Sequence, residues 1–248
     1  KLQDDVGAAR SLRKAMEFAS GDLETLRELV SSLVSAGDIG SARAAVSDAL
    51  AADAQGARPQ LLRMRADLAL TAGDEASAIR DLEEALTLGG TDVSPLLTQA
   101  LSRHAQRASA AGDIETARSA NLCLADLAQS SGDLEEAERI LFGWVDAHPE
   151  DRDVLQIMRE RFEAQERWDA CGKVWARLAQ IEEGEAKAQA VLAMANAWEK
   201  LNRAPEAIAH LKEVLVSLPK HVEVRARLAQ LLASAGNAIE AAQLHIEM

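Results

Sequence analysis

The sequence predicts an all-helical protein built from repeated antiparallel helix pairs, and three observations support this prediction. Hydrophobic residues make up 48% of the 248 residues, but aromatic residues make up only 3% and tyrosine is absent. The apolar content is therefore mostly Ala, Leu and Val, which suits closely packed helices better than sheets. Only five prolines occur, and no stretch of Val, Ile and Thr alternates as a half-buried strand would. The third observation is a short segment containing Gly-Asp that recurs along the chain.

The recurring segment keeps a fixed register, as in SAGDIGSARAAVSDAL at 35–50 and TAGDEASAIRDLEEAL at 71–86. The steps between successive turn positions are 34, 36, 39, 20, 34, 36 and 34 residues. Five of these positions hold glycine and three hold another residue: Gly37, Gly73, Gly112, Gly132 and Gly236, with Gln3, Glu166 and Asn202 as equivalents. Five residues later comes a small side chain in every copy: Ala8, Ala42, Ala78, Ala117, Ala137, Cys171, Ala207 and Ala241.

Each feature of this register has a physical reason. Glycine ends a helix because it accepts a positive φ, and the Asp that follows can cap the next helix. The small side chain lets the second helix approach the first closely. Apolar residues line the expected first helices, at Leu26, Leu29 and Leu33, at Leu62, Ala66 and Ala69, and at Val191, Ala195 and Trp198. Most second helices also have an apolar residue nine positions after the turn position, at Leu12, Val46, Leu82, Leu141, Trp175 and Leu211. Asn121 and His245 break this pattern.

The regular spacing fails once, near the middle of the chain. The 20 residues from Gly112 to Gly132 leave room for one helix, which must serve as the second helix of one unit and the first of the next. The preceding step of 39 residues inserts a loop signal, TLGGTDVSP, at 87–95. We therefore expect an irregular three-helix junction at 89–132, between regular repeats at 1–88 and at 133–248.

Both ends of the sequence fall inside a repeat. Residues 4–19 have the pattern of a second helix without its first, and residues 237–248 stop within a second helix. Solenoids need polar capping repeats for solubility, so we expect the sequence to be a fragment of a longer protein.

The period and the pattern resemble the tetratricopeptide repeat (TPR) family. The segment WDACGKVWARLAQIE at 168–182 has the aromatic residue after the turn, and two second helices stop at Pro149 and Pro219, as they often do in that family. The Trp-Leu-Gly-Tyr pattern of the family's first helices is mostly replaced by Leu and Ala. The resemblance implies a right-handed α-solenoid of about 14 helices. A generic helical bundle, or a related solenoid with longer repeats, is the alternative.

No catalytic or cofactor-binding signature appears in the sequence. It has no GxSxG, HExxH, P-loop or GxGxxG segment, so we expect no enzyme activity, no catalytic residue and no cofactor. Cys123 and Cys171 stand 48 residues apart and most simply are small buried side chains, with a disulfide or metal ligation as alternatives. The histidines are scattered and give no metal-ligand spacing, which indicates no metal site. They are His104, His148, His210, His221 and His245.

The net charge and the hydropathy argue against two further classes, nucleic-acid-binding proteins and membrane-spanning proteins. The formal net charge of −13 makes nucleic acid an unfavourable partner, since phosphate binding needs a basic surface. No run of 18 apolar residues could span a membrane. A cytoplasmic location is the default expectation, and a periplasmic one stays open.

The resemblance implies that first helices line a concave groove in which partner peptides lie. In the N-terminal half the inward polar candidates are Arg27, Arg63, Asp67, Arg103 and Gln106. The three arginines fall at matching places on successive first helices, within one residue, and would suit bidentate recognition of an acidic segment. Alternatively, Glu28, Asp67 and other local acids neutralise them.

The corresponding positions in the C-terminal half are mostly acidic and would prefer a basic segment. They are Asp153, Gln156, Glu160, Glu163, Asn196 and Glu199. The alternative is an acidic helical surface that binds nothing. Among the four tryptophans, Trp168, Trp175 and Trp198 fit packing positions, while Trp144 is expected to be exposed and available as an anchor for a partner.

These observations favour a non-enzymatic protein–protein interaction scaffold that recruits a peptide or a folded protein. The excess of Arg over Lys, 20 to 7, and the Ala richness fit a bacterial protein from a high-GC genome. Bacterial repeat proteins of this kind are similar to adaptors for motility, pilus assembly and cell polarity, among which a small GTPase is a possible partner by family analogy only. The alternatives are a passive structural or oligomerising segment, and a regulatory domain attached to an enzyme outside the fragment.

Overall fold

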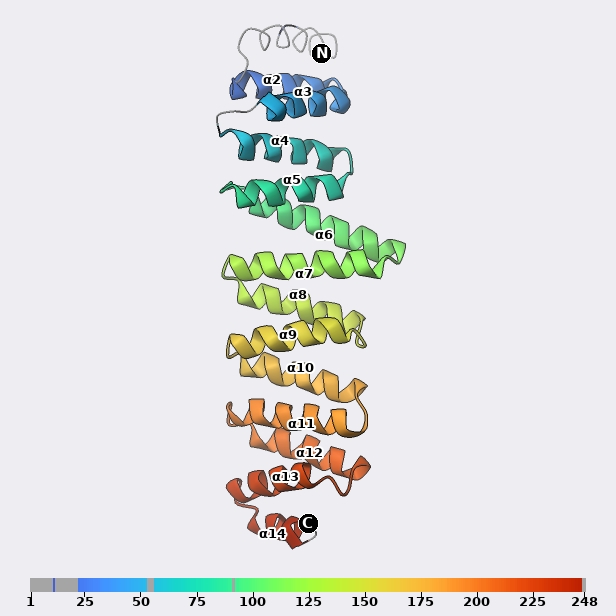
Figure 1. The fold of residues 1–248 in the computed structure, drawn as a ribbon, viewed down its shortest axis with the longest axis vertical. Helices are drawn as coiled ribbons and strands as arrows, with labels where there is room; N and C mark the ends of the chain where they lie inside the picture. The colour runs from blue at the N-terminus through green and yellow to red at the C-terminus, as the bar shows by residue number, and fades with distance from the viewer. Residues whose placement is uncertain (1–10, 12–21, 53–55, 91, 247–248) are drawn as a thin grey trace. The chain divides into compact units, whose positions relative to one another are not determined.

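The computed structural model describes residues 11, 22–52, 56–90 and 92–246, and all its regular elements there are helices (Figure 1). The prediction of an all-helical protein is therefore confirmed. The expected helix at 4–19, with Gln3, Ala8 and Leu12, lies outside the described residues apart from Ser11. The thirteen helices are α2 (Leu23–Ser35), α3 (Ile39–Ala52), α4 (Arg58–Thr71), α5 (Glu75–Thr87), α6 (Ser94–Ala111), α7 (Ile114–Ser130), α8 (Leu134–Ala147), α9 (Arg152–Ala164), α10 (Trp168–Ile181), α11 (Gly184–Glu199), α12 (Ala204–Ser217), α13 (Val222–Ser234) and α14 (Ala238–Ile246).

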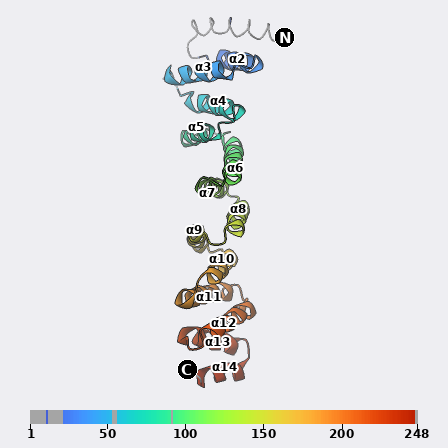
Figure 2. The same cartoon turned by 90° about the vertical axis from the view of Figure 1, so that its right-hand side faces the viewer.

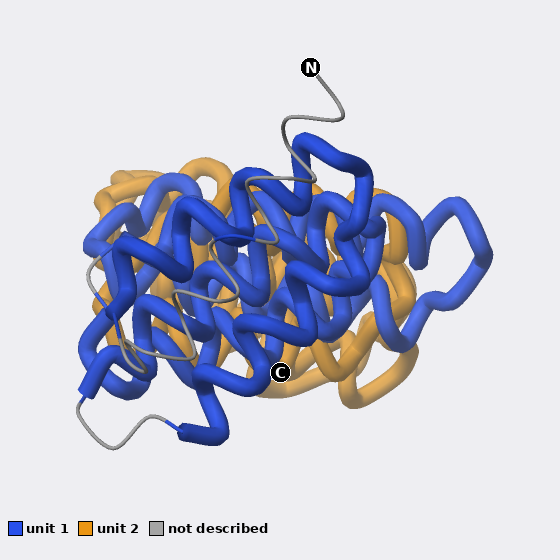
Figure 3. Tube along the Cα trace, turned by 90° about the horizontal axis from the view of Figure 1, so that it is seen from above, with its two compact units in different colours: residues 1–137 blue, residues 138–248 orange. Residues whose placement is uncertain are grey.

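The chain forms two compact units, residues 1–137 and residues 138–248 (Figure 3). In the first unit each helix from α2 to α7 packs against the next, and in the second unit the same holds from α9 to α14 (Figures 1 and 2). Successive helices run in opposite directions, so the packing is that of antiparallel pairs. The division predicted from the sequence, at 1–88, 89–132 and 133–248, stays a prediction.

The turn within each pair has one backbone form at all seven described positions. The backbone is left-handed there, with φ of 76° at Gly73 and 85° at Gly132. Glu166 and Asn202 also have positive φ, 55° and 57°, which confirms that they occupy the glycine position of the register. In every copy the next residue's N–H donates to the carbonyl five residues earlier, at 2.8–2.9 Å, and this closes the end of the first helix.

The residue after the turn position directly precedes the second helix, and an Asp there caps that helix. Asp74 accepts a hydrogen bond from the Ser77 backbone N–H at 3.1 Å, and Asp113 does the same for Thr116. Hydrogen bonds from the Ser77 side chain and backbone lower the pKa of Asp74. A carboxyl group whose pKa is lowered by folding stabilises the fold at pH values above its ordinary pKa. For Asp74 this stabilisation is lost as the pH falls through the folded-state pKa.

The small residue five positions after the turn is buried in every described copy. The exposed fraction of these residues is between 0% and 5%, so each second helix lies close to its neighbours, as the sequence predicted. They are Ala42, Ala78, Ala117, Ala137, Cys171, Ala207 and Ala241. Four residues further on, Val46, Leu82, Leu141 and Leu211 are also buried. Asn121 fits the same place because its side-chain amide donates to the Ala117 carbonyl at 2.8 Å.

One helix occupies the short step between Gly112 and Gly132, as the spacing predicts, and its role as the shared helix of two repeats stays a prediction. α7 is the only helix between Gly112 and Gly132, and a left-handed turn stands at each of its ends. The loop signal before it forms the connection from α5 to α6. There Gly89 has φ of 81°, and a Cβ on Gly90 would lie 2.8 Å from the Ala85 carbonyl oxygen.

One tight contact between helices of the second unit depends on a glycine. A Cβ on Gly172 in α10 would lie 2.1 Å from Nε1 of Trp198 in α11. The Trp198 side chain is buried, with 6% of its surface exposed, and its ring centroid lies 5.4 Å from that of His210. The indole therefore occupies the space above Gly172, and any larger residue there must displace it.

We expect Gly172→Ala to lower the free energy of unfolding by about 1–3 kcal/mol, because the added methyl overpacks the contact with Trp198. Urea unfolding followed by circular dichroism measures this change. Gly143→Ala is the matched control, since Gly143 is exposed in α8 and nothing lies within 4 Å of its Cβ position. The control should raise the free energy of unfolding by about 0.5–1 kcal/mol through helix propensity alone. Equal effects of the two substitutions would contradict the role of the indole.

Candidate functional site

The first helices of the first unit present three arginines to solvent. Arg27 lies on α2, Arg63 on α4 and Arg103 on α6, and all three are exposed. In the part of the chain that the structure describes, neither Arg27 nor Arg103 forms an ion pair. Arg63 Nη1 lies 3.8 Å from the carboxylate of Asp92, whose side chain is 81% exposed. An ion pair this long and this exposed contributes little, so all three guanidiniums remain accessible to a ligand.

Asp67 follows Arg63 by one helical turn on α4. Desolvation raises the pKa of its carboxyl, and the charge of Arg63 opposes that rise. When ionised, Asp67 reduces the positive charge around Arg63. The cationic character of this surface therefore depends most on Arg27 and Arg103.

A pocket of about 540 Å³ opens between the α4–α5 turn and α6. Arg103 and Gln106 line it, opposite residues 70–73. A third side chain of α6, Arg107, forms part of the wall and is fixed there. Its Nη1 donates to the Gly73 carbonyl at 2.8 Å and to the buried carboxylate of Glu75 at 2.6 Å. The pocket thus brings two of the predicted residues, Arg103 and Gln106, to one site.

The predicted polar residues of the second unit are all exposed, on α9 and α11, but they are partly neutralised. Arg227 of α13 donates to Asn196 Oδ1 at 2.7 Å and also binds the Glu199 carboxylate. Its side chain is only 15% exposed, so it is held between the helices. Arg159 lies 3.3 Å from Glu160. Arg227 was missed by sequence reasoning, although it stands nine residues before Gly236, as Arg103 stands nine before Gly112.

One residue of this acidic surface contacts a buried thiol. The Cys171 Sγ lies 3.9 Å from Glu163 Oε1. Burial raises the pKa of the Cys171 thiol to about 11, and the negative charge of Glu163 adds to the rise. Both Cys171 and Cys123 are unbridged thiols, which excludes a disulfide between them in this structure.

The prediction that Trp144 is an exposed anchor is wrong. Its side chain is buried, with 6% exposed, and its Nε1 donates to Asp151 Oδ2 at 2.8 Å. The ring stacks on His148, with 3.9 Å between centroids. The segment after α8 forms a turn in which the Asp151 N–H donates to the His148 carbonyl at 3.1 Å, and this brings Asp151 to the indole. The indole therefore fixes this loop instead of facing a partner.

The described part of the chain has neither a metal-binding cluster nor a membrane-spanning helix. No three His, Cys, Asp or Glu side chains gather there as ligands for a metal ion would. None of the helices there combines the length and the apolar character needed to cross a bilayer.

The raised pKa of Cys171 has a measurable consequence. Because the folded-state pKa of about 11 exceeds the ordinary value of 9.0, the protonated thiol favours the fold, and this contribution disappears as the pH rises from about 9 to about 11. In a Cys123→Ser variant at pH 8.5, we expect a thiol reagent to label Cys171 at least about tenfold more slowly in the folded than in the urea-unfolded protein. The Cys171→Ser variant, which reports the half-buried Cys123, is the control. Equal labelling rates in both states would contradict the burial.

Comparisons with known proteins give structural similarity only. No family model matches the sequence, and no curated protein matches it either. A tetratricopeptide repeat protein from Parabacteroides merdae is 13% identical, over 90% of this chain and 91% of its own, with a TM-score of 0.32. The TPR2AB domain of yeast Sti1, solved as a pHSP90 complex, is 18% identical over 87% and 84% of the two chains, with a TM-score of 0.32. The P58(IPK) TPR domain is 12% identical over 98% and 78%, with a TM-score of 0.33.

These scores are too low to support an argument, so the fold follows from the chain's own repeat. The turn positions recur at steps of 34 to 39 residues outside the shared helix, and the turn is left-handed in every described copy. A small residue is buried five positions later in each copy. Within each unit these features recur in helix pairs that pack one after another, so the chain is an α-helical repeat protein whose period resembles that of the tetratricopeptide repeat.

Proposed function

We propose that this chain is a non-enzymatic interaction scaffold that recruits an acidic segment of a partner protein to the first helices of its first unit. The observation that carries the proposal is the pair of exposed guanidiniums of Arg27 and Arg103, which have no ion-pair partner among the described residues. Arg63 stands at the equivalent position on the helix between them. Arginines whose positions on successive first helices match within one residue suit a ligand with several carboxylates.

The pocket beside Arg103 supports the same proposal. Its volume of about 540 Å³ is sufficient for one side chain of a partner, and Gln106 adds an amide donor next to the guanidinium. Arg107 cannot serve the ligand in the same way, since Glu75 and the Gly73 carbonyl already bind it. An acidic side chain in this pocket would therefore bind Arg103, while neighbouring carboxylates reach Arg63 and Arg27.

Charge reversal tests the proposal. A fluorescein-labelled peptide of alternating glutamate and glycine is titrated with the protein at low salt, and fluorescence polarisation gives the Kd. We expect Arg27→Glu with Arg103→Glu to raise the Kd at least about tenfold, since each substitution replaces an attraction by a repulsion.

Arg58→Glu is the matched control because Arg58 is an exposed arginine of α4 that already pairs with Glu84 at 2.7 Å. It changes the net charge by the same amount per residue without touching the proposed surface. A Kd that is unchanged in the double variant, or that rises as much per substitution in the control, would overturn the proposal. Absence of peptide binding to the unmodified protein would favour the passive structural segment.

On the second unit, we propose a basic segment as the matching ligand of α9. Its exposed carboxylates are Asp153, Glu160 and Glu163. Arg159 and Arg227 already bind Glu160 and Glu199, which makes this surface the weaker of the two. It stays a prediction that the chain is a regulatory domain attached to an enzyme. It also stays a prediction that it acts in motility, pilus assembly or cell polarity with a small GTPase as partner.

A further inference from the structure

A second polar pocket lies on another face of the first unit, between α3, α4 and α5. Its volume is about 380 Å³, and all the residues that line it are of polar or charged type: Arg43, Ser47, Arg65, Ser77, Arg80 and Asp81. Arg65 follows Arg63 by two residues, so the two side chains leave α4 about 200° apart. The pocket is therefore separate from the surface that carries Arg27, Arg63 and Arg103.

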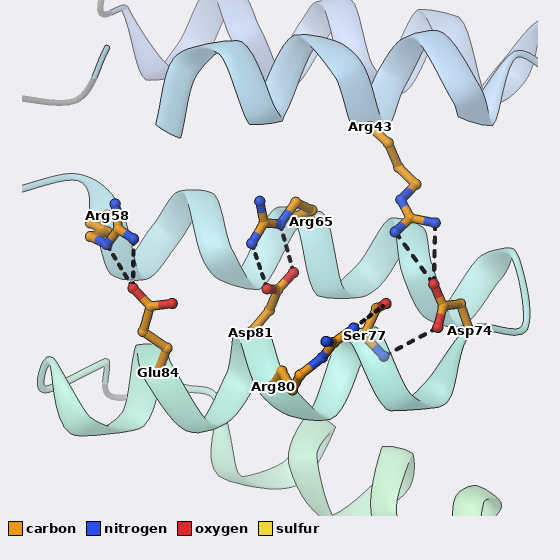
Figure 4. A network of polar contacts seen from close by, with 8 residues as sticks. All are labelled: Arg43, Arg58, Arg65, Asp74, Ser77, Arg80, Asp81 and Glu84. Carbon is orange, nitrogen blue, oxygen red and sulfur yellow. Dashed lines mark hydrogen bonds and ion pairs between the residues drawn. The ribbon is translucent and has the colours of Figure 1, made fainter. Parts of the chain in front are cut away.

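One ion pair forms the rigid wall of this pocket (Figure 4). Arg65 Nε donates to Asp81 Oδ2 at 2.8 Å and its Nη2 to Asp81 Oδ1 at 2.6 Å. Asp81 is buried, with 7% exposed, and hydrogen bonding to it raises the pKa of Arg65. This bidentate pair holds α4 to α5, and it leaves the Nη1 group of Arg65 without an acceptor among the described residues.

The other two arginines of the pocket are poorly neutralised. Arg43 reaches from α3 to Asp74 with both Nη atoms at 3.4 Å, which is too long for a strong pair (Figure 4). The same carboxylate already caps α5 through the Ser77 N–H. Arg80 has no carboxylate partner in the described ranges, and its one contact is to the Ser77 hydroxyl at 3.1 Å. Two guanidiniums, one from α3 and one from α5, are thus left to bind a further anion.

The charges around the pocket indicate what kind of anion fits. Three guanidiniums face two carboxylates, those of Asp74 and Asp81, which leaves one positive charge. The neighbouring pair of Arg58 and Glu84 is neutral as a whole. A single carboxylate would balance this charge, and Ser47 and Ser77 provide hydroxyl donors for its second oxygen. A phosphate dianion would leave the site negative.

We propose that this pocket is a binding site for one carboxylate, supplied by an acidic side chain of a partner protein. Arg43 and Arg80 bind the two carboxylate oxygens from opposite sides, and Arg65 orients the site from its fixed position on Asp81. The site does not depend on the function proposed above, because it uses different residues on a different face of α4.

N-acetyl-glutamate amide, which has one carboxylate, is the probe, and the Nε–H resonances of the arginines are followed by NMR during its titration. We expect saturable shifts of the Arg43 and Arg80 signals, and at least about tenfold weaker binding in Arg80→Gln. Arg58→Gln removes the same charge from the neighbouring helix α4, outside the pocket lining, and should leave the shifts unchanged. Ser47→Asp keeps every arginine but places a carboxylate in the pocket, and should abolish the shifts.

The alternative outcomes are distinct. Shifts that grow linearly without saturation, or that weaken equally in Arg58→Gln and Arg80→Gln, would overturn the proposal. Saturable binding of inorganic phosphate in a parallel titration, with none of the glutamate amide, would show that the site takes phosphate and that the carboxylate assignment is wrong. Far-UV circular dichroism of each variant checks that the fold is retained. The Arg27→Glu with Arg103→Glu variant should bind the probe here as the unmodified protein does.

Discussion

The structure depends on one backbone constraint, the left-handed turn that ends each first helix. A residue with positive φ lets the next N–H return to the carbonyl five residues earlier, and the same next residue directly precedes the second helix. The geometry fixes the angle between the two helices, and a small buried side chain five residues later is then required at their contact. Glu166 and Asn202 show that this packing outweighs the local cost of a left-handed conformation in a residue with a side chain.

The repeat determines which two positions form an ion pair, but either position can carry the positive charge. Arg43 stands six residues after its turn and binds Asp74, which follows the next turn. In the second unit, Glu138 stands six residues after its turn and binds Arg167, which follows the next turn, at 2.5 Å. The two ion pairs join equivalent positions with the charges exchanged. The Asp74 side chain caps α5, whereas the Arg167 side chain does not cap α10. At this position the second unit therefore keeps the ion pair but has no side-chain cap.

Sequence reasoning succeeded where the controlling interactions are local. The turn, its hydrogen bond and the buried Ala span only ten residues, so their pattern repeats visibly in the chain, on both sides of α7. It failed where a residue's surroundings come from the next repeat or the next loop. Trp144 is covered by the segment that follows α8. The Arg43, Arg65 and Arg80 pocket also escaped notice, because its walls come from three helices and only the fold shows which arginines Asp74 and Asp81 leave unpaired.

The overall charge constrains how arginine sites on this protein can act. A chain with a net charge of −13 repels an acidic ligand at long range, so electrostatic steering cannot accelerate their encounter. The attraction exists only within a few ångströms of the exposed guanidiniums, where bidentate geometry matters more than net charge. Salt then has two opposing effects, since it screens the long-range repulsion and also weakens the local pairs. Binding at such sites therefore depends on the placement of carboxylates in the ligand, and a ligand that is merely acidic is excluded by the rest of the surface.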